Sequence, residues 1–510
     1  MSNFLIRNDG LAALGLSVLL ILPTVLISNS PIIQTTFAQT EGEQQTSPAA
    51  TATNDTSGQQ GTDQQQVRLP SQEGFSVQVL ATNFSAPYNI LYGPDSALWI
   101  TERVGKNITR IDPNTGDRLS SIPVPNVWQS APQDGLMGMA FDPDFNNTHY
   151  IYVAYTYEGE QGTELDRLTK ITRFTYYPEN SSIAEPRDLI TGLSGSTLHN
   201  SGRLIFGPDG MLYYTIGDQG KNYLANYCQN NEAQHLPRAE EVAAQNWDAY
   251  EGKVLRMNPD GSIPDDNPVL NGVRSHIFTY GLRNAQGIAV GPDGNSLYIS
   301  EHGDKSDDEV NRLQSGGNYG WPYVAGHNDE QSAYQYVNWS SAENCEALEF
   351  SNIGTSPAEL RVVNESDFEA ENFVPPVATF YTVPNDFNFT DPACAGIDYI
   401  CWPTVTPSSL RLYTSDAIPG WNGTFLMTTL KAGRIFQLAL DENGTALAQD
   451  SIDLFRSENR YRDIAFSPDG LTIYAITDSS GPAQATDGGA TTELWNPGSL
   501  LVFRYNGEGG

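Results

Sequence analysis

The stretch GPDGNSLYISE, residues 291–301, determines how this chain is expected to fold. A Gly-Pro-Asp-Gly turn leads directly into β-branched and aromatic residues, which is typical of a β-hairpin. The same unit recurs at residues 93–102, 207–215 and 467–477. Strand–turn–strand units in four distant segments, with almost no helical periodicity, predict the blades of an all-β propeller.

Two segments depart from this pattern. Residues 258–261 (NPDG) form a similar turn after the strand expected at residues 253–257, but no clear strand comes after it. Residues 237–247 (PRAEEVAAQNW) are the one helix-like stretch, expected as an insertion between strands. A pair of β-sandwiches is the competing architecture, and the wide recurrence of the unit favours the propeller.

The N-terminal region has the composition of an export signal followed by a linker. Arg7 supplies a positive charge, residues 11–28 are uncharged, and residues 36–38 (TFA) offer a cleavage site, so residues 1–38 are expected to be a signal peptide. An uncleaved membrane anchor is the alternative. Residues 39–66 are rich in Gln, Thr, Ser and Gly and predict a disordered linker. Residues 67–510 remain for the propeller domain.

The charge and the cysteines indicate the environment of the protein. A formal net charge of −34 with only 27 Lys and Arg argues against nucleic acid or an anionic membrane as a partner. Four cysteines fit an oxidising compartment. Cys394 and Cys401 are close enough in sequence to close a small disulfide, whereas pairing of Cys228 with Cys345 stays open. We therefore expect a secreted or cell-surface protein.

Glycosylation sequons also fit an exported chain, although several of these short motifs arise by chance. They begin at Asn54, Asn83, Asn107, Asn146, Asn180, Asn338, Asn364, Asn388, Asn422 and Asn443.

His199 is the strongest candidate for acid–base chemistry. It lies in a polar, Gly-containing loop just before a strand expected at residues 204–206, and a loop histidine at the mouth of a rigid sheet suits a general base. An ordinary hydrogen-bonding histidine is the alternative. The six histidines show no i, i+4 or i, i+2 pairs, which leaves a histidine-built zinc site without support.

Two further clusters carry candidate ligands. Residues 301–309 concentrate carboxylates and suit calcium, although an acidic loop is often only solvated. Arg460 and Arg462 flank Tyr461, so in a strand both point to one face. Together with Lys431 they favour a small polyanionic ligand, with local salt bridges as the alternative. No GxGxxG, Walker A, GxSxG or CxxC pattern is present.

Long strings of the chain resemble the soluble quinoprotein glucose dehydrogenases and the related glucose/sorbosone (aldose sugar) dehydrogenases, over about residues 75–505. These strings include GLMGMAFDPDF (135–145), HNSGRLIFGPDG (199–210), GKVLRMNPDGSIPDDNP (252–268), GGNYGWP (316–322), DYICWPTV (398–405) and NRYRD (459–463). The resemblance implies a six-bladed β-propeller with four-stranded antiparallel blades, pyrroloquinoline quinone (PQQ) and Ca²⁺ as cofactors, and a homodimer.

The resemblance also implies roles for individual residues. His199 matches the general base, Asp218 the carboxylate that orients it, and Arg283 the cation beside the reacting quinone carbonyl. The residues matching cofactor contacts are Arg283, Asn284, Thr404, Lys431, Arg460 and Arg462. The residues matching the sugar-facing wall are Gln133, Leu198, Tyr223, Tyr399 and Trp402. The residues matching calcium ligands are Gly303 and Asp304, through their carbonyls at the cofactor, and Asp308, Glu309, Tyr319, Ala325, Asp329 and Glu365.

Some positions depart from the family pattern. Leu198 replaces an aspartate and Tyr223 a glutamine, so two hydrogen-bonding groups to the sugar are missing and the preferred sugar stays open. Asp304 replaces a proline and His302 a glutamine near the cofactor calcium. A further proline is replaced by Ala285, with a mild effect expected.

The resemblance predicts oxidation of an aldose at its anomeric carbon to a lactone, with electrons passed to an unidentified external acceptor. Two other functions stay open. A calcium-dependent lactonase propeller needs no quinone and has no use for the Lys431, Arg460 and Arg462 cations. A non-catalytic propeller that binds glycans or protein partners tolerates the loss of His199.

Overall fold

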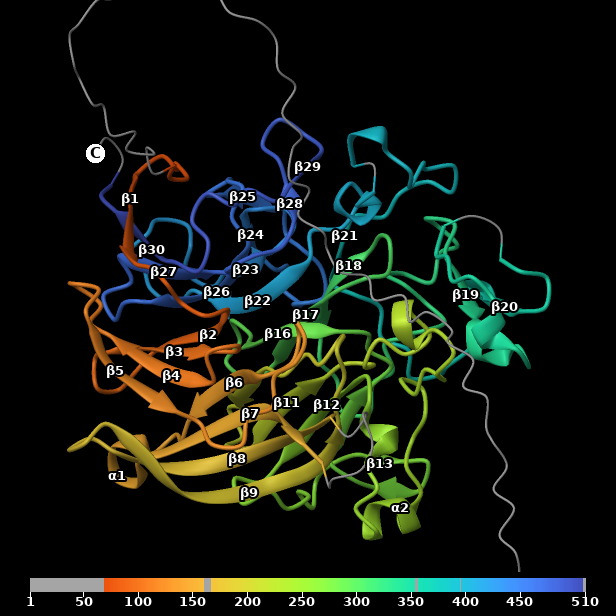
Figure 1. Ribbon diagram of the computed structural model, residues 1–510, viewed down its shortest axis with the longest axis horizontal. Coiled ribbons are helices and arrows are strands. Elements are labelled where there is room, and N and C mark those ends of the chain that lie inside the picture. The colour runs from red at the N-terminus through yellow and green to blue at the C-terminus, as the bar shows by residue number, and fades with distance from the viewer. Residues whose placement is uncertain (1–67, 160–166, 354–355, 395, 508–510) are drawn as a thin grey trace, which may run out of the picture. The chain divides into compact units, whose positions relative to one another are not determined.

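Six four-stranded antiparallel sheets surround a common axis in the computed structural model, which describes residues 68–159, 167–353, 356–394 and 396–507 (Figure 1). The predicted six-bladed β-propeller is therefore confirmed. The expected signal peptide and linker, residues 1–66, lie outside the described residues. Among the described residues, no helix is long and apolar enough to cross a membrane.

Each blade begins with its innermost strand, and the innermost strands of adjacent blades pack against one another. The first three blades are β2 (Pro87–Tyr92), β3 (Leu98–Glu102), β4 (Asn107–Ile111) and β5 (Arg118–Pro123); β6 (Leu136–Phe141), β7 (Tyr150–Glu158), β8 (Arg167–Tyr177) and β9 (Ser182–Ser194); and β10 (Leu204–Phe206), β11 (Leu212–Ile216), β12 (Lys253–Met257) and β15 (Ile277–Tyr280). The next two are β16 (Ala285–Val290), β17 (Leu297–Glu301), β18 (Asp308–Arg312) and β21 (Ala378–Phe380); and β22 (Pro407–Leu412), β23 (Phe425–Thr429), β24 (Ile435–Leu438) and β25 (Ile452–Leu454).

The sixth blade closes the ring with strands from both ends of the described chain. Its first three strands are β26 (Tyr461–Phe466), β27 (Thr472–Thr477) and β30 (Leu500–Tyr505), and its outermost strand is β1 (Phe75–Ala81). β1 pairs antiparallel with β30, with Phe75 opposite Tyr505. Because backbone hydrogen bonds join the two ends, the ring has no open seam between its first and last blades.

The recurrent Pro-Asp turns, Gly-Pro-Asp in three blades and Ser-Pro-Asp in the sixth, join the first and second strands of four blades, all at one end of the propeller. The aspartate stabilises each turn, because its carboxylate accepts nearby donors. Asp95 accepts from the Trp99 indole at 2.9 Å, and Asp209 from the Tyr213 hydroxyl at 2.9 Å. The opposite end carries the connections between the second and third strands, which in the third blade extend over residues 217–252.

Close packing at the axis places constraints on individual residues. A Cβ atom at Gly138 would lie 2.3 Å from the carbonyl oxygen of Gly202, so the inner strands approach too closely for a side chain there. Beside these strands, the carboxylate of Asp463 accepts hydrogen bonds from Arg203 at 2.8 Å and Arg411 at 2.8 Å. This pairing ties three different blades together at the axis.

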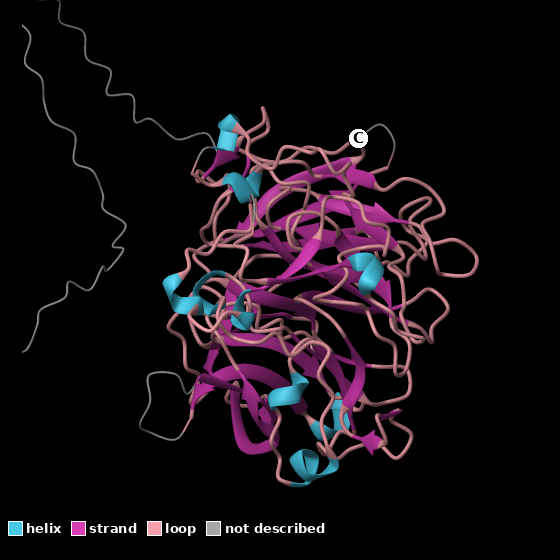
Figure 2. Ribbon diagram, turned by 90° about the vertical axis from the view of Figure 1, so that its right-hand side faces the viewer, coloured by secondary structure: helices cyan, strands magenta, loops and turns pink. Residues whose placement is uncertain are grey.

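Elements outside the blades are short, and Figure 2 shows the helices at the periphery of the strands. The helices are α1 (Phe145–Thr148) and α2 (Ala239–Ala243), with 3-10 turns at Leu224–Asn226, Asp248–Tyr250, Trp339–Ser341, Cys345–Ala347, Glu365–Asp367, Pro392–Cys394 and Asp398–Ile400. Three two-stranded ribbons pair β13 (Val269–Leu270) with β14 (Val273–Arg274), β19 (Gln335–Asn338) with β20 (Arg361–Asn364), and β28 (Ala483–Gln484) with β29 (Ala490–Thr491).

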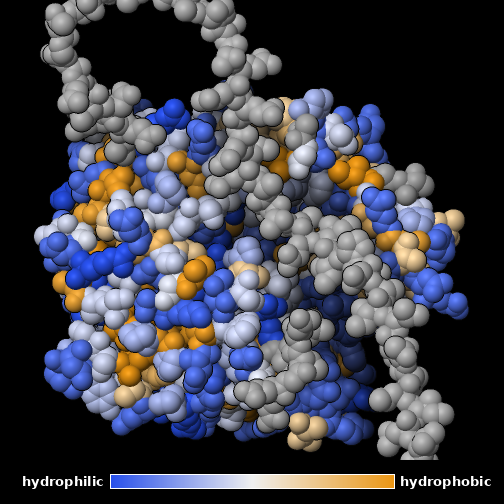
Figure 3. Space-filling model, viewed as in Figure 1, coloured by the Kyte–Doolittle hydropathy of each residue, from blue (hydrophilic) through white to orange (hydrophobic). Residues whose placement is uncertain are grey.

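The sequence expectations for these peripheral segments are largely confirmed. The helix expected at residues 237–247 forms only over Ala239–Ala243, and residues 258–261 are not followed by a strand before β13. Both disulfides are present, Cys228–Cys345 and Cys394–Cys401. The face in Figure 3 is predominantly hydrophilic, with apolar residues in small scattered groups, as expected for a strongly acidic chain.

Candidate active site

The candidate residues gather at the end of the propeller opposite the Gly-Pro-Asp turns. In an antiparallel pair, the first strand begins where the second strand ends, so residues at these two positions are neighbours. The expected residues that precede a first strand are Gln133, His199, Arg283, Thr404 and Arg460. Asp218 and Lys431 follow a second strand. The fold therefore brings residues from five blades to one end.

His199 and Asp218 form a buried pair. The imidazole Nδ1 lies 2.7 Å from Asp218 Oδ1, and the two residues are 6% and 1% exposed. The Asp218 carboxylate also accepts from the Gly220 N–H at 2.9 Å and the Trp321 indole at 2.8 Å. Burial, the largest single effect, raises the pKa of Asp218, but its interactions with His199, Arg283 and the Gly220 N–H together outweigh burial and the pKa is lowered. Asp218 is therefore an anion that accepts a hydrogen bond from the Nδ1–H of His199.

This arrangement leaves the other ring nitrogen of His199 available. Nε2 takes no hydrogen bond from any residue in the described part of the chain. Burial and the nearby charge of Arg283 lower the pKa of His199, and the opposing effect of Asp218 is smaller. The backbone is held by Gln133, whose side-chain oxygen accepts the His199 N–H at 2.8 Å. A neutral imidazole with a free, oriented Nε2 has the properties of a general base.

Arg283 is held between two aromatic rings beside this pair. Its guanidinium carbon lies 5.2 Å from the ring centres of both Tyr223 and Trp321, and one terminal nitrogen lies 3.6 Å from Asp304 Oδ1. Burial lowers the pKa of Arg283, but Asp304 and Asp218 outweigh it and the pKa is raised. The guanidinium Nε is buried and has no partner among the described residues. Arg283 is thus a permanent, positioned cation.

Asn284 and His302 form a neutral hydrogen-bonded pair next to Arg283. The Asn284 amide nitrogen donates to His302 Nδ1 at 3.2 Å, and His302 Nε2 donates to the carbonyl of Pro407 at 2.8 Å. Burial and the charge of Arg283 keep the pKa of His302 well below its usual value. Since His302 is neutral, its replacement of a glutamine adds no charge to this side of the site.

The wall next to His199 is aromatic. The Tyr223 ring stacks on the His199 ring at 5.7 Å with an interplanar angle of 21°, and Phe350 packs edge-on against Tyr223 at 5.8 Å. The segment carrying Phe350 is joined to the segment carrying Tyr223 by the Cys228–Cys345 disulfide. Sequence reasoning did not identify Phe350, because its only signal is a contact that the fold creates.

Lys431 binds three of the residues that were expected at the sugar or the cofactor. Its ammonium donates to the carbonyls of Tyr399 at 3.1 Å and Trp402 at 2.9 Å and to the hydroxyl of Thr404. Burial lowers the pKa of Lys431 to about 7, with a smaller opposing effect of Asp308. The expected sugar-wall residues Tyr399 and Trp402 therefore contact an expected cofactor residue directly.

The two arginines around Tyr461 point to one side, as predicted, and share a carboxylate. Arg462 binds both oxygens of Asp478 at 2.8 and 2.7 Å, and Arg460 Nε lies 3.4 Å from the same carboxylate. A third arginine, Arg103, interacts electrostatically with Asp478 and was not identified from the sequence. Arg103 directly follows β3, just as His302 directly follows β17. The strand repeat therefore indicates that Arg103 lies at the same end of the propeller as His302.

The acidic loop makes two different kinds of contact. Asp308 accepts three backbone N–H groups, from Gly303 at 2.8 Å and from Val405 and Thr406 at 2.6 Å each, so its side chain holds the loop in place. No hydrogen bond between described residues uses the carbonyls of Gly303 or Asp304. These carbonyls have the oxygen chemistry that calcium prefers.

Two of the remaining expected calcium ligands, Glu309 and Glu365, contact the turn of residues 325–326. Glu309 accepts the Gly326 N–H at 2.7 Å, and Glu365 accepts the Ala325 N–H at 3.0 Å. Burial, followed by the nearby charge of Glu301, raises the pKa of Glu309 well above its usual value. Burial raises the pKa of Glu365 to about 7, and Asp329 adds to this shift. Buried carboxylates that repel one another fit a site for a divalent cation.

These carboxylates do not converge as a set of side-chain ligands. Among the described ranges, no three His, Cys, Asp or Glu side chains come together with metal-binding geometry. The expected donors include carbonyl oxygens, among them that of Tyr319, whose hydroxyl instead donates to the carbonyl of Arg312 at 2.6 Å.

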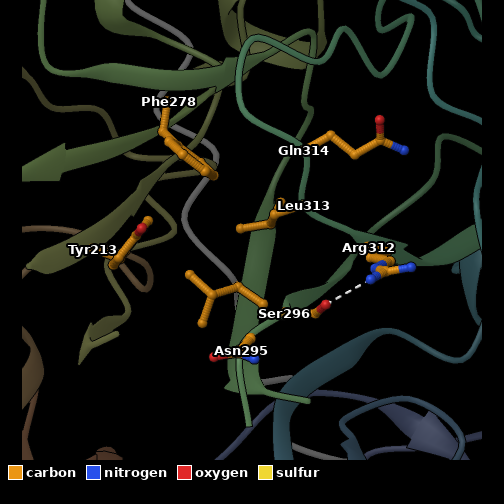
Figure 4. A pocket seen from close by; sticks show the side chains of 8 residues that line it. Tyr213, Phe278, Asn295, Ser296, Arg312, Leu313 and Gln314 are labelled. Atoms are coloured by element: carbon orange, nitrogen blue, oxygen red, sulfur yellow. Dashed lines mark hydrogen bonds between the residues drawn. The ribbon is translucent and has the colours of Figure 1, made fainter. Parts of the chain in front are cut away.

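A groove elsewhere on the molecule is distinct from the site. It has a volume of about 480 Å³, lies at the end that carries the Gly-Pro-Asp turns, and is lined by Tyr213, Phe278 and the Asn295–Leu297 and Arg312–Gln314 segments (Figure 4). Arg312 donates to the Ser296 hydroxyl at 2.7 Å across it. None of the candidate residues lines this groove.

Comparison with known proteins gives a consistent result. The family model for glucose / sorbosone dehydrogenase matches residues 84–373 and 390–484. Quinoprotein glucose dehydrogenase B of Acinetobacter calcoaceticus is 45% identical over 442 residues, covering 86% of this chain and 92% of the relative. The aldose sugar dehydrogenase YliI of Escherichia coli is 26% identical over 416 residues, covering 79% and 90%.

A solved structure agrees with the fold. The PQQ-bound aldose sugar dehydrogenase of Streptomyces coelicolor aligns with a TM-score of 0.55 at 24% identity, covering 86% of this chain and 99% of that protein. The matched sequence, the six-bladed fold and the site residues lead to one conclusion. The chain belongs to the glucose/sorbosone dehydrogenase family.

Proposed function

We propose that this protein is a quinoprotein that oxidises an aldose at its anomeric carbon to the corresponding lactone. The observation that carries this proposal is the buried His199–Asp218 pair lying beside Arg283, at the same end of the propeller as the Lys431, Arg460 and Arg462 cations. The pair supplies a base for the sugar hydroxyl. The separate group of cations supplies a binding site for a polyanionic cofactor.

The residues of this chain divide the work of the reaction. His199 Nε2 accepts the proton of the anomeric hydroxyl, and the Asp218 carboxylate stabilises the imidazolium that forms. Arg283 provides fixed positive charge where negative charge develops on the electron acceptor. Gln133 holds the His199 backbone, which keeps the base in its orientation. Tyr223 covers one face of the imidazole and excludes water from it.

The residues present fit both expected cofactors. Arg460, Arg462 and Lys431 would hold the carboxylates of pyrroloquinoline quinone, and the carbonyls of Gly303 and Asp304 would bind Ca²⁺. When bound, the quinone supplies the acceptor for the hydride removed from the anomeric carbon, and Ca²⁺ acts as a Lewis acid on it. Electrons then pass to an external acceptor.

A reconstitution experiment tests this function. PQQ and Ca²⁺ are added, separately and together, to metal-stripped protein, and dye reduction is measured over a panel of aldoses. We expect turnover only when both are present. Tight quinone binding without turnover on any aldose would contradict the assigned reaction. Absence of quinone binding would favour a propeller that only binds glycans or partners.

Substitution of the base tests the role of His199. His199→Ala should reduce turnover by about 10²- to 10⁴-fold, because a general base contributes this much, while quinone affinity is retained. His235→Ala is the matched control, since His235 is exposed and pairs only with Glu232. Turnover by His199→Ala equal to that of the control would refute the assignment.

We also propose that the protein is exported. Two disulfides and a strongly acidic chain fit an oxidising, extracellular environment. Mass spectrometry of protein recovered from culture medium tests this directly. A mature chain that begins near residue 39 is the expected result, and retention of residues 1–38 in a membrane fraction would indicate an anchor instead.

A further inference from the structure

Arg103 is a buried cation whose guanidinium has no hydrogen-bond partner among the described residues. The residue follows β3 and is only 8% exposed. Its backbone is fixed, because its N–H donates to Ala86 at 2.9 Å and its carbonyl accepts from Leu136 at 3.2 Å. No side-chain hydrogen bond or ion pair of Arg103 is formed with any described residue, and its Nε is sealed from solvent. A buried guanidinium without partners is unfavourable unless something else binds it.

The surroundings of Arg103 contain more positive than negative charge. Arg103, Arg460 and Arg462 all act on one carboxylate, that of Asp478. Both oxygens of Asp478 are already used by Arg462, at 2.8 and 2.7 Å. Burial lowers the pKa of Arg103 to about 10, and repulsion from Arg462 is the next cause. Three guanidinium groups against one carboxylate leave an excess of two positive charges.

Away from the site, the buried arginines that the structure describes, Arg203 and Arg256, are paired. Arg203 donates to Asp463 and to the carbonyls of Gln286 and Ser408. Arg256 binds the carboxylates of Asp209 and Asp266. The lack of partners at Arg103 is therefore specific to the site and indicates an anionic ligand that the chain itself does not supply.

The location of Arg103 also associates it with the site. The backbone of Gly135 packs directly on Arg103, so closely that a Cβ atom there would lie 2.3 Å from its carbonyl oxygen. This segment follows Gln133, which holds His199. Arg103 thus lies between the segment that positions the base and the Arg460–Arg462 pair.

We propose that Arg103 is a further cofactor-binding residue, whose guanidinium binds a carboxylate of the quinone together with Arg460 and Arg462. The assignment rests on the proposed function. It extends the cationic site to the first blade. Arg462 belongs to the sixth blade, which lies between the first blade and the fifth blade that carries Lys431. A planar guanidinium suits this role, because it can offer two parallel N–H donors to one carboxylate.

A binding experiment on the full chain tests the assignment without using turnover. The Ca²⁺-loaded, quinone-free protein is titrated with PQQ and with its trimethyl ester, and the dissociation constants are obtained from tryptophan fluorescence. Arg103→Met should weaken PQQ binding about 10- to 100-fold, as expected for loss of a hydrogen bond between charged groups, and leave ester binding unchanged. The PQQ affinity of Arg103→Lys should lie between those of the wild type and Arg103→Met.

Stability of the quinone-free protein separates ligand binding from a structural role. Removing an unpaired buried charge should leave the melting temperature of Arg103→Met equal to or above that of the wild type. Arg256→Gln is the matched control: it should lower the melting temperature, because the hydrogen bonds of the buried guanidinium to Asp209 and Asn267 are lost, and leave quinone affinity unchanged.

The outcomes distinguish the two proposals. Wild-type protein that does not bind PQQ would overturn the proposed function and this assignment with it. Tight wild-type binding with unchanged affinity in Arg103→Met would overturn the assignment alone. Equal weakening for PQQ and its ester, together with a lower melting temperature, would show that Arg103 is structural and would also overturn it.

Discussion

Two arginine–aspartate clusters begin at adjacent residues of β26, and they differ in how completely their charges are paired. Asp463 accepts from Arg203 and Arg411, from the Asn89 amide at 2.7 Å and from the Ile90 N–H at 3.0 Å. The next residue back, Arg462, lies at an irregularity in the pairing of β26 with β27 and joins Arg460 and Arg103 around Asp478. One cluster is satisfied within the protein, and the other retains excess charge.

The difference shows how a buried charge can be assigned to structure or to function. In the Asp463 cluster, the remaining donors of Arg203 are taken by backbone carbonyls, so the network is complete without a ligand. In the Asp478 cluster, Arg103 makes no such contact within the described residues. A complete network stabilises the ring of blades, whereas an incomplete one is stabilised by an anion that binds.

Asp463→Asn is expected to have the largest effect on the free energy of unfolding, because it leaves Arg203 and Arg411 without their carboxylate. Loss of one partner of a buried ion pair destabilises a protein by about 3–5 kcal/mol. Arg203 and Arg411 outweigh burial, the largest single effect, and lower the pKa of Asp463 to about 2. Its stabilisation is therefore fully present above about pH 4, the usual carboxyl pKa, and is lost as the pH falls towards 2.

Urea unfolding at pH 7 and at pH 3 measures both effects. The difference in unfolding free energy between wild type and Asp463→Asn should be large at pH 7 and smaller at pH 3. Asp266→Asn is the control, because Asp266 is 75% exposed and its loss should have little effect. Equal stability of the two variants would show that the Asp463 cluster contributes nothing beyond a surface ion pair.

Lys431, another cation expected at the cofactor, tests the charge requirement of the site through pH. Because burial lowers its pKa to about 7, Lys431 is neutral above this pH when the quinone is absent. A polyanion favours the charged form, so binding above pH 7 requires uptake of a proton. Quinone affinity should therefore fall as the pH rises, by at most about tenfold per pH unit.

Titrations with PQQ between pH 6 and 9 check this prediction. The affinity of the wild type should be constant below about pH 7 and decline above it. Lys431→Met should bind more weakly at pH 6 and lose this decline, since the titrating group is gone. An equally steep decline in the variant would assign the proton uptake to another group.

The blade pattern could be predicted from the sequence because its causes are local. In each Gly-Pro-Asp turn, the aspartate accepts donors two to four residues away, as Asp95 does from Ala97 and Trp99. The segment at residues 237–247 was predicted less well. There the chain leaves the helix after Ala243, Gln245 has a φ of +55°, and the Trp247 indole donates to the carbonyl of Thr191 at 2.9 Å. That contact is distant in sequence.

The site could be predicted in part for the same reason. His199, Asp218 and the Arg460–Arg462 pair lie in motifs that resemble the family, and their position at one end follows from the strand order. Phe350 could not be found in this way, and for Arg103 the strand repeat indicates the position but not the role. The significance of Arg103 lies in its missing partners and that of Phe350 in its contact with Tyr223, and both are properties of the folded chain.

The cost of leaving a buried polar group without a partner applies to the substrate as well, where the expected effect on kcat/KM is smaller than the effects on stability and quinone affinity. In the proposed site, Leu198 and the Tyr223–Phe350 pair would form an aliphatic and aromatic wall of the sugar pocket. A sugar hydroxyl that faces this wall would lose its water and find no hydrogen-bond partner there. The wild type should therefore discriminate weakly between a hexose and its deoxy analogues. Tyr223→Gln adds an amide and should raise the kcat/KM ratio of hexose to deoxy analogue about tenfold.

Steady-state kinetics on glucose and its singly deoxygenated analogues measure this ratio, and the analogue that responds identifies the hydroxyl that faces Tyr223. Tyr223→Phe is the control, because it keeps the stacking on His199 and adds no amide. A ratio unchanged in Tyr223→Gln for every analogue would place the sugar away from this wall. If the ratio changes as expected, a sugar hydroxyl without a hydrogen-bond partner weakens binding. An unpaired buried group of the protein, such as the Arg103 guanidinium, is unfavourable for the same reason.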